Sequence, residues 1–89
     1  MVRKKVRVLN KAGLHARPSS VLVKTASKFD ADFYIEMKGY KVNGKSILGV
    51  MTLAAEEGAE LELILDGDDE YKALESISNL FQNEFGIED

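Results

Sequence analysis

The residue with the greatest chemical potential in this sequence is His15, the single histidine among 89 residues. Histidine is the side chain whose unperturbed pKa lies between pH 5 and 8, so it can exchange protons or accept a transferred group near neutrality. The single proline, Pro18, follows it closely, and Gly13 precedes it. Because proline fixes its backbone angle and glycine permits unusual angles, the segment 13–18 is expected to have a defined local conformation.

Pro18 also indicates where a helix begins. Proline is tolerated in a helix only within the first turn, so the helical pattern here should begin at Ala16 or Arg17 and continue to about Phe29. His15 then lies at the mouth of that helix, where backbone N–H groups lack partners and the helix dipole provides partial positive charge. An anion is stabilised at such a position, and phosphate is the commonest example.

These features predict a phosphoryl-acceptor site. A neutral imidazole nitrogen is a nucleophile, so His15 is the candidate acceptor. The backbone N–H groups of Ala16 and Arg17 would hold the oxygens of the new phosphoryl group, and the Arg17 guanidinium would add charge-assisted hydrogen bonds. The residues alone leave a plainer alternative open, in which His15 is an exposed capping or turn residue.

Other kinds of catalytic centre lack the residues that they need. The sequence contains no cysteine, which excludes disulfides and thiolate metal sites. A single histidine leaves little for a zinc site. The sequence also shows no obvious pairing of a serine with a base of the kind that a hydrolase needs. We therefore expect no metal and no cofactor, and a protein that carries a group rather than an enzyme that acts alone.

Ser46 is the second candidate for chemistry, because it is well placed as the N-cap of a short helix that ends at Leu53. The apolar residues of this helix spread over about 220° of the helical wheel, which is wider than one buried face needs. Either the helix is buried on most sides, or its outer edge is an apolar contact patch.

The ordinary role of a serine at a helix N-cap, such as Ser46, is purely structural. A phosphate on Ser46 would be tolerated by the helix dipole and would add about two negative charges beside the apolar edge.

The remaining pattern predicts the elements that position these residues. Alternating apolar and polar side chains predict strands at 2–9, 33–37, 40–42 and 60–65, and Leu61, Leu63 and Leu65 alternate there with Glu60, Glu62 and Ile64. A last helix is expected to be capped by Asp68 or Asp69 and to end at Gly86. The order strand, helix, strand, strand, short helix, strand, helix predicts a two-layer α+β sandwich.

The first helix is expected to have a buried and an exposed side. At 100° per residue, four apolar residues fall on one line, and the polar ones fall opposite. The predicted core stripe is Pro18, Leu22, Ala26 and Phe29, and the predicted outer side is Arg17, Ser20, Lys24, Ser27 and Lys28.

Charge is distributed unevenly along the chain, although the net charge is only −3. Eleven of the 12 basic residues lie in residues 1–50, and 12 of the 15 acidic residues lie in residues 51–89. Folding either interleaves the two halves into mixed faces, or leaves a basic surface around His15 that faces an acidic partner or a phosphate.

Length and hydropathy predict a single domain over residues 1–89. The pattern at the start is that of a strand, and no long apolar run indicates a signal peptide or a membrane span. We therefore expect a cytoplasmic protein without membrane insertion.

Two segments carry a resemblance to a known family. Residues 13–18, Gly-Leu-His-Ala-Arg-Pro, and residues 44–51, Gly-Lys-Ser-Ile-Leu-Gly-Val-Met, resemble the two signature segments of HPr. This family comprises the histidine-containing phosphocarriers of the bacterial sugar phosphotransferase system. The resemblance implies an open-faced sandwich of four antiparallel strands covered on one side by three helices, in the order βαββαβα.

The resemblance also implies roles for particular residues. His15 would accept phosphate on Nδ1 from the phosphoenolpyruvate-dependent first enzyme of the system and pass it to the IIA domains of sugar permeases, with Arg17 assisting. Ser46 matches a position that a dedicated kinase phosphorylates in some bacteria, where the product binds a catabolite-control transcription factor. The residues implied in partner docking are Ser20, Lys24, Ile47, Leu48 and Met51.

Two functions remain open beside that of a phosphocarrier. In a regulatory binding module, modification of Ser46 would control a transcription factor and His15 would be incidental. In a small nucleic-acid or ligand-binding domain, the basic stripe of Arg17, Lys24 and Lys28 would contact phosphates. The net negative charge and the absence of exposed aromatic residues in that stripe argue against nucleic acid, so no nucleic-acid partner is expected.

Overall fold

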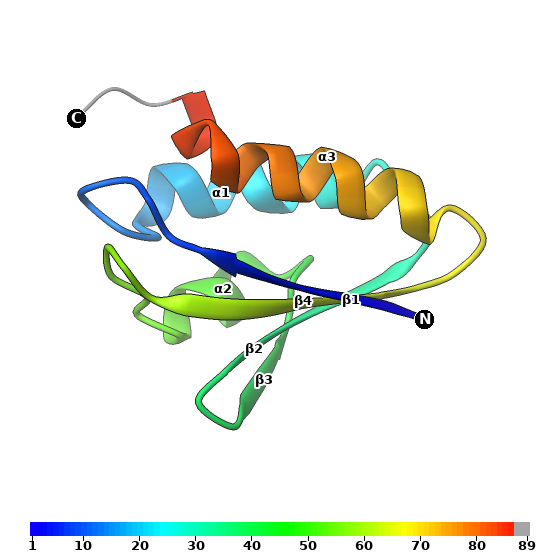
Figure 1. Cartoon of the computed structure of the whole chain (residues 1–89), viewed down its shortest axis with the longest axis horizontal. Helices are drawn as coiled ribbons and strands as arrows, with labels where there is room; N and C mark the ends of the chain where they lie inside the picture. Colours follow the sequence, from blue (N-terminus) through cyan, green and yellow to red (C-terminus); the bar gives the residue numbers. More distant parts are fainter. Residues whose placement is uncertain (87–89) are drawn as a thin grey trace.

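Four segments of alternating apolar and polar residues form one antiparallel sheet, with the strand order β1-β4-β2-β3 (Figure 1). The computed structural model describes residues 1–86. The elements in chain order are β1 (Val2–Arg7), α1 (Ala16–Ala26), β2 (Asp32–Met37), β3 (Tyr40–Asn43), α2 (Ile47–Thr52), β4 (Glu60–Asp66), α3 (Glu70–Gln82) and a 3₁₀ turn, η1 (Glu84–Gly86).

The register of the sheet explains which residues form the core. In β4, a central strand, Leu61, Leu63 and Leu65 point to one face because side chains alternate along a strand. Leu65 lies opposite Val2 of β1 and Phe33 of β2. These leucines are buried, so the face that carries them is the inner face of the sheet.

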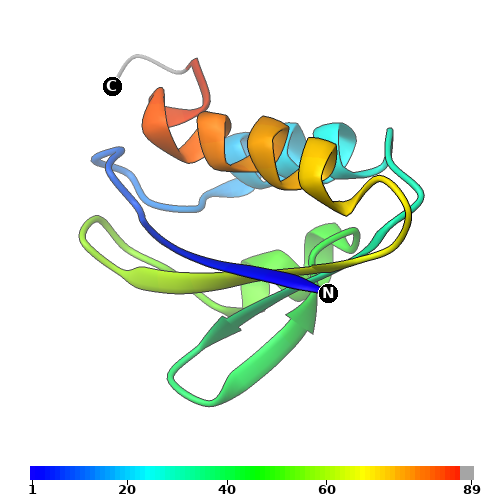
Figure 2. The same ribbon diagram turned by 45° about the vertical axis from the view of Figure 1, so that its right-hand side comes forward.

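The helices cover this inner face. Figures 1 and 2 show α1 and α3 lying side by side across the sheet, and α2 packs against α1 and β3. Each helix contributes a fully buried side chain to the same core, namely Leu22, Val50 and Ile77. The predicted α+β open-faced sandwich and its element order are confirmed. Within residues 1–86, no helix is long and apolar enough to cross a membrane.

Ile64 differs from the expected pattern. Its alternation with the leucines places it on the outer face, yet it is buried and lies outside the main core. The register puts it between Arg3 of β1 and Tyr34 of β2, so longer side chains flank it on both sides. A central position in the sheet therefore buries a residue that the alternating pattern alone assigns to solvent.

Four element ends lie earlier than predicted, and the smallest difference is that of α2, which stops at Thr52 rather than Leu53. The strand β1 stops at Arg7 rather than at residue 9, although the Val8 N–H still donates to the Ala59 carbonyl at 2.9 Å. The helix α1 stops at Ala26 rather than Phe29, because the amides of residues 28 and 29 donate to carbonyls three residues back, at 3.1 and 3.2 Å. Such tight turns commonly close a helix.

The last helix also ends before the predicted residue. It stops at Gln82 rather than Gly86, and Glu84 and Phe85 then adopt left-handed backbone angles with φ of 55° and 61°. The Phe85 ring is buried edge-to-face against Phe81, with 4.9 Å between the ring centroids. This contact compensates for a conformation that is unfavourable for a bulky residue.

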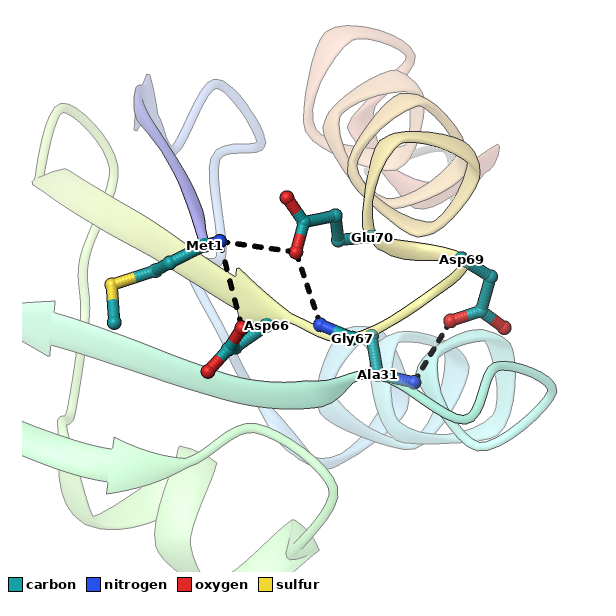
Figure 3. A network of polar contacts seen from close by, with 6 residues as sticks. All are labelled: Met1, Ala31, Asp66, Gly67, Asp69 and Glu70. Atoms are coloured by element: carbon teal, nitrogen blue, oxygen red, sulfur yellow. Dashed lines mark hydrogen bonds and ion pairs between the residues drawn. The ribbon is translucent and has the colours of Figure 1, made fainter.

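Asp69 occupies the N-cap of α3, as predicted, but its side chain does not cap the helix. Its carboxylate instead accepts hydrogen bonds of 2.9 Å from the backbone amides of Asp30 and Ala31 (Figure 3 shows the second). These bonds, the Asp30 bond foremost, lower the pKa of Asp69. The next residue, Glu70, accepts from the Gly67 amide at 3.0 Å and pairs with the Met1 amino group at 3.2 Å.

Candidate functional site

His15 occupies the N-cap position of α1, the place that the position of Pro18 predicts. Its backbone is extended, with φ −68° and ψ −179°, and its side chain is exposed and makes no capping hydrogen bond. The imidazole is therefore open to a partner protein.

The two residues that follow His15 in the chain each have a backbone N–H group that can act as a hydrogen-bond donor. The first turn of a helix has N–H groups without intrahelical partners. Here Pro18 has no N–H, and the Ser19 amide already donates to the His15 carbonyl at 2.9 Å. This leaves the amides of Ala16 and Arg17, and no hydrogen bond to either is found within residues 1–86. The helix mouth thus has two unoccupied donors, suited to the oxygens of an anion.

A tight loop before α1 presents His15 in this position. Gly13 has a left-handed backbone with φ 74°, and a Cβ there would collide with the carbonyl oxygen of Ala55. The next amide, of Leu14, donates to that same oxygen at 2.9 Å. The segment that follows α2 therefore supports the loop that carries His15.

Asn10 before this loop and Ser19 in α1 are two further residues that hold the loop and that the sequence reasoning missed. The Nδ2 group of Asn10 donates to the Gly13 carbonyl at 2.5 Å, and the Oγ of Ser19 donates to the Leu14 carbonyl at 3.1 Å. Both side chains are buried. Ser19 lies three residues before Leu22, so helical phase could have placed it on the buried side of α1. No sequence signal identified its acceptor.

The exposed side of α1 is as predicted. Arg17, Ser20 and Lys24 are exposed, and no ion pair to Arg17 or Lys24 is found within the described part of the chain. In contrast, Arg3 and Arg7 of β1 pair with glutamates of β4 at 2.9 and 3.5 Å. Folding thus interleaves the charges on the sheet, while Arg17 and Lys24 of α1 have no ion pair among the described residues.

The short helix α2 has an apolar outer edge. Ile47, Leu48 and Met51 are 39%, 75% and 40% exposed, whereas Val50 and Leu53 are buried. The sequence left two alternatives, a helix buried on most sides or one with an exposed apolar patch, and the structure shows the exposed patch. The helix α2 is in contact with α1, the helix that carries His15 at its start.

Ser46 is the N-cap of α2, as predicted, and is half-buried. Its Oγ accepts a hydrogen bond from the Gly49 amide at 3.1 Å. The neighbouring Lys45 extends its ammonium group to the Phe29 carbonyl at 2.7 Å, which ties the start of α2 to the end of α1. Within residues 1–86, no group of three or more His, Cys, Asp or Glu side chains is arranged to hold a metal ion.

Comparison with known proteins assigns the chain to a family. The family model described as the PTS HPr component phosphorylation site matches residues 2–83. The chain belongs to the HPr family. The matched range contains His15, Arg17 and Ser46 and spans every strand and every α-helix of the fold. The family resemblance of the two segments is thereby confirmed.

The similarity extends over nearly the whole chain. Phosphocarrier protein HPr of Treponema pallidum (strain Nichols) is 53% identical over 85 residues, which cover 96% of this chain and 97% of that protein. The HPr-like protein Crh of Bacillus subtilis (strain 168) is 46% identical over 84 residues, covering 94% and 99%. A crystal structure of HPr-C-His from Thermoanaerobacter tengcongensis has a TM-score of 0.95 at 40% identity, covering 100% of both chains.

Membership in the HPr family makes this chain a phosphocarrier of the phosphotransferase system, whose enzymes are its partners.

Proposed function

We propose that His15 takes the phosphoryl group, receiving it from the phosphoenolpyruvate-dependent first enzyme and passing it to IIA domains of sugar permeases. The observation that carries this proposal is the position of His15 at the N-cap of α1. Its ring is exposed, and the two residues that follow it in the chain, Ala16 and Arg17, have amides without a hydrogen-bond partner within residues 1–86. An acceptor needs a nucleophile that a partner can reach and donors that hold the added oxygens, and this helix end supplies both.

The proposed reaction is a displacement at phosphorus. The Nδ1 atom of His15 forms the new P–N bond while the bond from phosphorus to the donor atom of the first enzyme breaks, and that donor atom keeps the electron pair. In the onward step an acceptor atom of the IIA domain attacks the same phosphorus, and the His15 ring leaves. The amides of Ala16 and Arg17 and the Arg17 guanidinium donate to the phosphoryl oxygens in both steps. The chain is consumed and regenerated stoichiometrically, as a carrier rather than an enzyme.

We assign partner docking to two neighbouring surfaces. One is the exposed side of α1 with Ser20 and Lys24, and the other is the apolar edge of α2 with Ile47, Leu48 and Met51. An apolar patch on α2 and exposed basic groups on the contacting helix α1 fit partners that present an apolar centre and an acidic rim. The first enzyme and the IIA domains would then share one docking surface, because both must reach the same imidazole.

Incubation with phosphoenolpyruvate and the first enzyme tests this function. The wild-type chain is expected to take up one acid-labile phosphoryl group, and His15→Ala to take up none. Ser27→Ala, which changes an exposed residue at the C-cap of the same helix, is the matched control and should still be labelled. Acid-labile label on His15→Ala would disprove the assignment.

We also propose that Ser46 is a regulatory phosphorylation site, served by a kinase and read by a catabolite-control transcription factor. Its hydroxyl lies at the start of α2, beside the exposed Ile47 and Leu48. The similarity to Crh, the catabolite repression HPr of Bacillus subtilis, supports this assignment. A phosphate there would add about two negative charges next to the docking surface and repel an acidic partner rim.

A phosphomimetic variant tests the regulatory proposal. Ser46→Asp should keep the fold, measured by circular dichroism, and lower the rate of His15 phosphorylation by the first enzyme at least tenfold. Ser46→Ala, which removes the cap without adding charge, should lose about 1 kcal/mol of stability and keep its phosphorylation rate. Equal rates for Ser46→Asp and wild type would contradict the proposal.

A further inference from the structure

The backbone that leads into His15 is held by two buried polar side chains, Asn10 and Ser19. We propose that both are positioning residues for phosphoryl transfer, because they set the direction in which His15 and the two free amides of α1 point. This inference rests on the proposed function, since it concerns the geometry of the same site.

Ser19 ties the start of α1 back onto the residues before it. Its amide donates to the His15 carbonyl at 2.9 Å, and its Oγ donates to the Leu14 carbonyl at 3.1 Å. The side chain is 0% exposed, so water does not compete for this hydroxyl. One residue thus fixes the peptide groups on both sides of the His15 Cα atom.

Asn10 holds the same loop from the other end. Its Nδ2 group donates to the Gly13 carbonyl at 2.5 Å, and its own carbonyl accepts from the Gly13 amide at 3.1 Å. The residue is 1% exposed, and its Oδ1 atom has no hydrogen-bond partner within the described residues. An unpaired buried oxygen lowers stability, and an apolar side chain of similar size would avoid that cost. The contribution of asparagine at this position is therefore its donor to Gly13, not its packing.

The Leu14 amide donates to the Ala55 carbonyl at 2.9 Å. Hydrogen-bond partners are therefore present for the carbonyls of residues 13, 14 and 15 and for the amides of residues 13 and 14. Within residues 1–86, no hydrogen bond from the amides of Ala16 and Arg17 is found. Phosphoryl transfer depends on alignment of the nucleophile with the donors that hold the phosphoryl oxygens, and a displacement of about 1 Å can reduce a rate about 10²-fold. Loss of one of these bonds is expected to relax that alignment while leaving the docking surface intact.

Ser19→Ala is the sharpest test, because it removes one hydroxyl and keeps the amide bond to His15. The matched control is Ser78→Ala in α3: Ser78 is also buried, and its Oγ donates to the Glu75 carbonyl at 3.2 Å. With the chain as substrate of the first enzyme, Ser19→Ala should lower kcat about tenfold with KM unchanged, whereas Ser78→Ala should change neither. A raised KM at unchanged kcat, or equal effects of the two variants, would overturn the inference.

Asn10→Leu tests the second residue, since it removes both the donor and the unpaired oxygen at similar volume. The inference predicts a lower kcat with KM unchanged, because the carbonyl of the buried Gly13 loses its side-chain donor. A kcat equal to that of wild type would show that Asn10 has no positioning role.

NMR supplies a readout that does not depend on phosphorylation. The ¹H–¹⁵N shifts of residues 15–17 should move in Ser19→Ala and stay in place in Ser78→Ala. Unchanged shifts overturn the positioning inference, whereas absence of label on the wild-type chain overturns only the proposed function.

Discussion

Replacement of Gly13 by alanine tests how strongly the fold constrains the loop that carries His15. At this position the backbone has φ 74°, and a Cβ would collide with the Ala55 carbonyl oxygen. That oxygen accepts the Leu14 amide at 2.9 Å, so the loop cannot move away from it without losing the hydrogen bond. Gly39 provides the matched control, because its φ is 86° and an added Cβ there meets nothing within 4 Å.

The structure allows the two costs to be separated. A left-handed backbone costs a residue with a Cβ about 1–2 kcal/mol, and the lower entropy of the unfolded alanine chain offsets about 0.5 kcal/mol of it. Gly39→Ala should therefore lose about 1 kcal/mol. Gly13→Ala carries the same cost, and in addition loses or strains a buried hydrogen bond worth about 1–2 kcal/mol. Its total loss should be about 2–3 kcal/mol.

Urea denaturation of both variants and wild type measures these differences, with the first-enzyme phosphorylation assay as the functional readout. Gly13→Ala should unfold at a urea concentration about 1 M below that of Gly39→Ala. It should also be phosphorylated more slowly, whereas Gly39→Ala should react like wild type. Equal midpoints for the two variants would refute the reasoning, because they would show that the Ala55 carbonyl does not constrain the loop.

Three further predictions concern the core, the docking surface and the polar contact at the start of α3. Leu63→Ala removes a fully buried side chain and should lower the free energy of unfolding by about 2–5 kcal/mol in urea titrations. Leu48→Ala removes a side chain that is 75% exposed; it should change stability by less than about 0.5 kcal/mol, yet weaken first-enzyme binding measured by calorimetry. Asp69→Asn should lower the melting temperature at pH 7. The pKa of Asp69 lies below the ordinary 3.8, so its carboxylate stabilises the fold at and above that pH, and the difference from wild type should fade as the pH falls below it. Asp68→Asn, at an exposed neighbour, is the matched control and should change stability at pH 7 by less than about 0.5 kcal/mol.

The start of α1 could be predicted from sequence because it depends on neighbours in the chain. Pro18 restricts the helix start locally, so the N-cap position of His15 follows without knowledge of the rest of the fold. The end of α1 could not be predicted in the same way. Phe29 keeps the helical phase and contacts the core, yet tight turns have already replaced the helix there. Periodicity reports which residues face the core, not which backbone bonds connect them.

Contacts between distant segments account for the parts of the site that sequence reasoning missed. Asp69 has the residue type and position of a helix cap, but two amides of the α1–β2 loop compete successfully for its carboxylate. Ala55 supports the His15 loop through its backbone oxygen, which any residue has, so its side chain gives no signal. The acceptors of Asn10 and Ser19 are likewise backbone carbonyls. These contacts become visible only when the loop and the helix are seen together.

A phosphoryl carrier has two requirements that oppose each other. The structure meets one through the exposed side chain of His15 and the other through the buried contacts of the backbone before it. The acceptor ring must be exposed so that different partners can reach it, yet its direction must be fixed so that transfer is fast. His15 is exposed and makes no side-chain capping bond, while the peptide groups before it are bound by buried donors and by the Ala55 oxygen. Rigidity therefore resides in the backbone beneath the ring rather than in contacts to the ring itself. For this reason, substitutions in the buried layer should change the rate of transfer, whereas substitutions on the exposed edge of α2 should change affinity for partners.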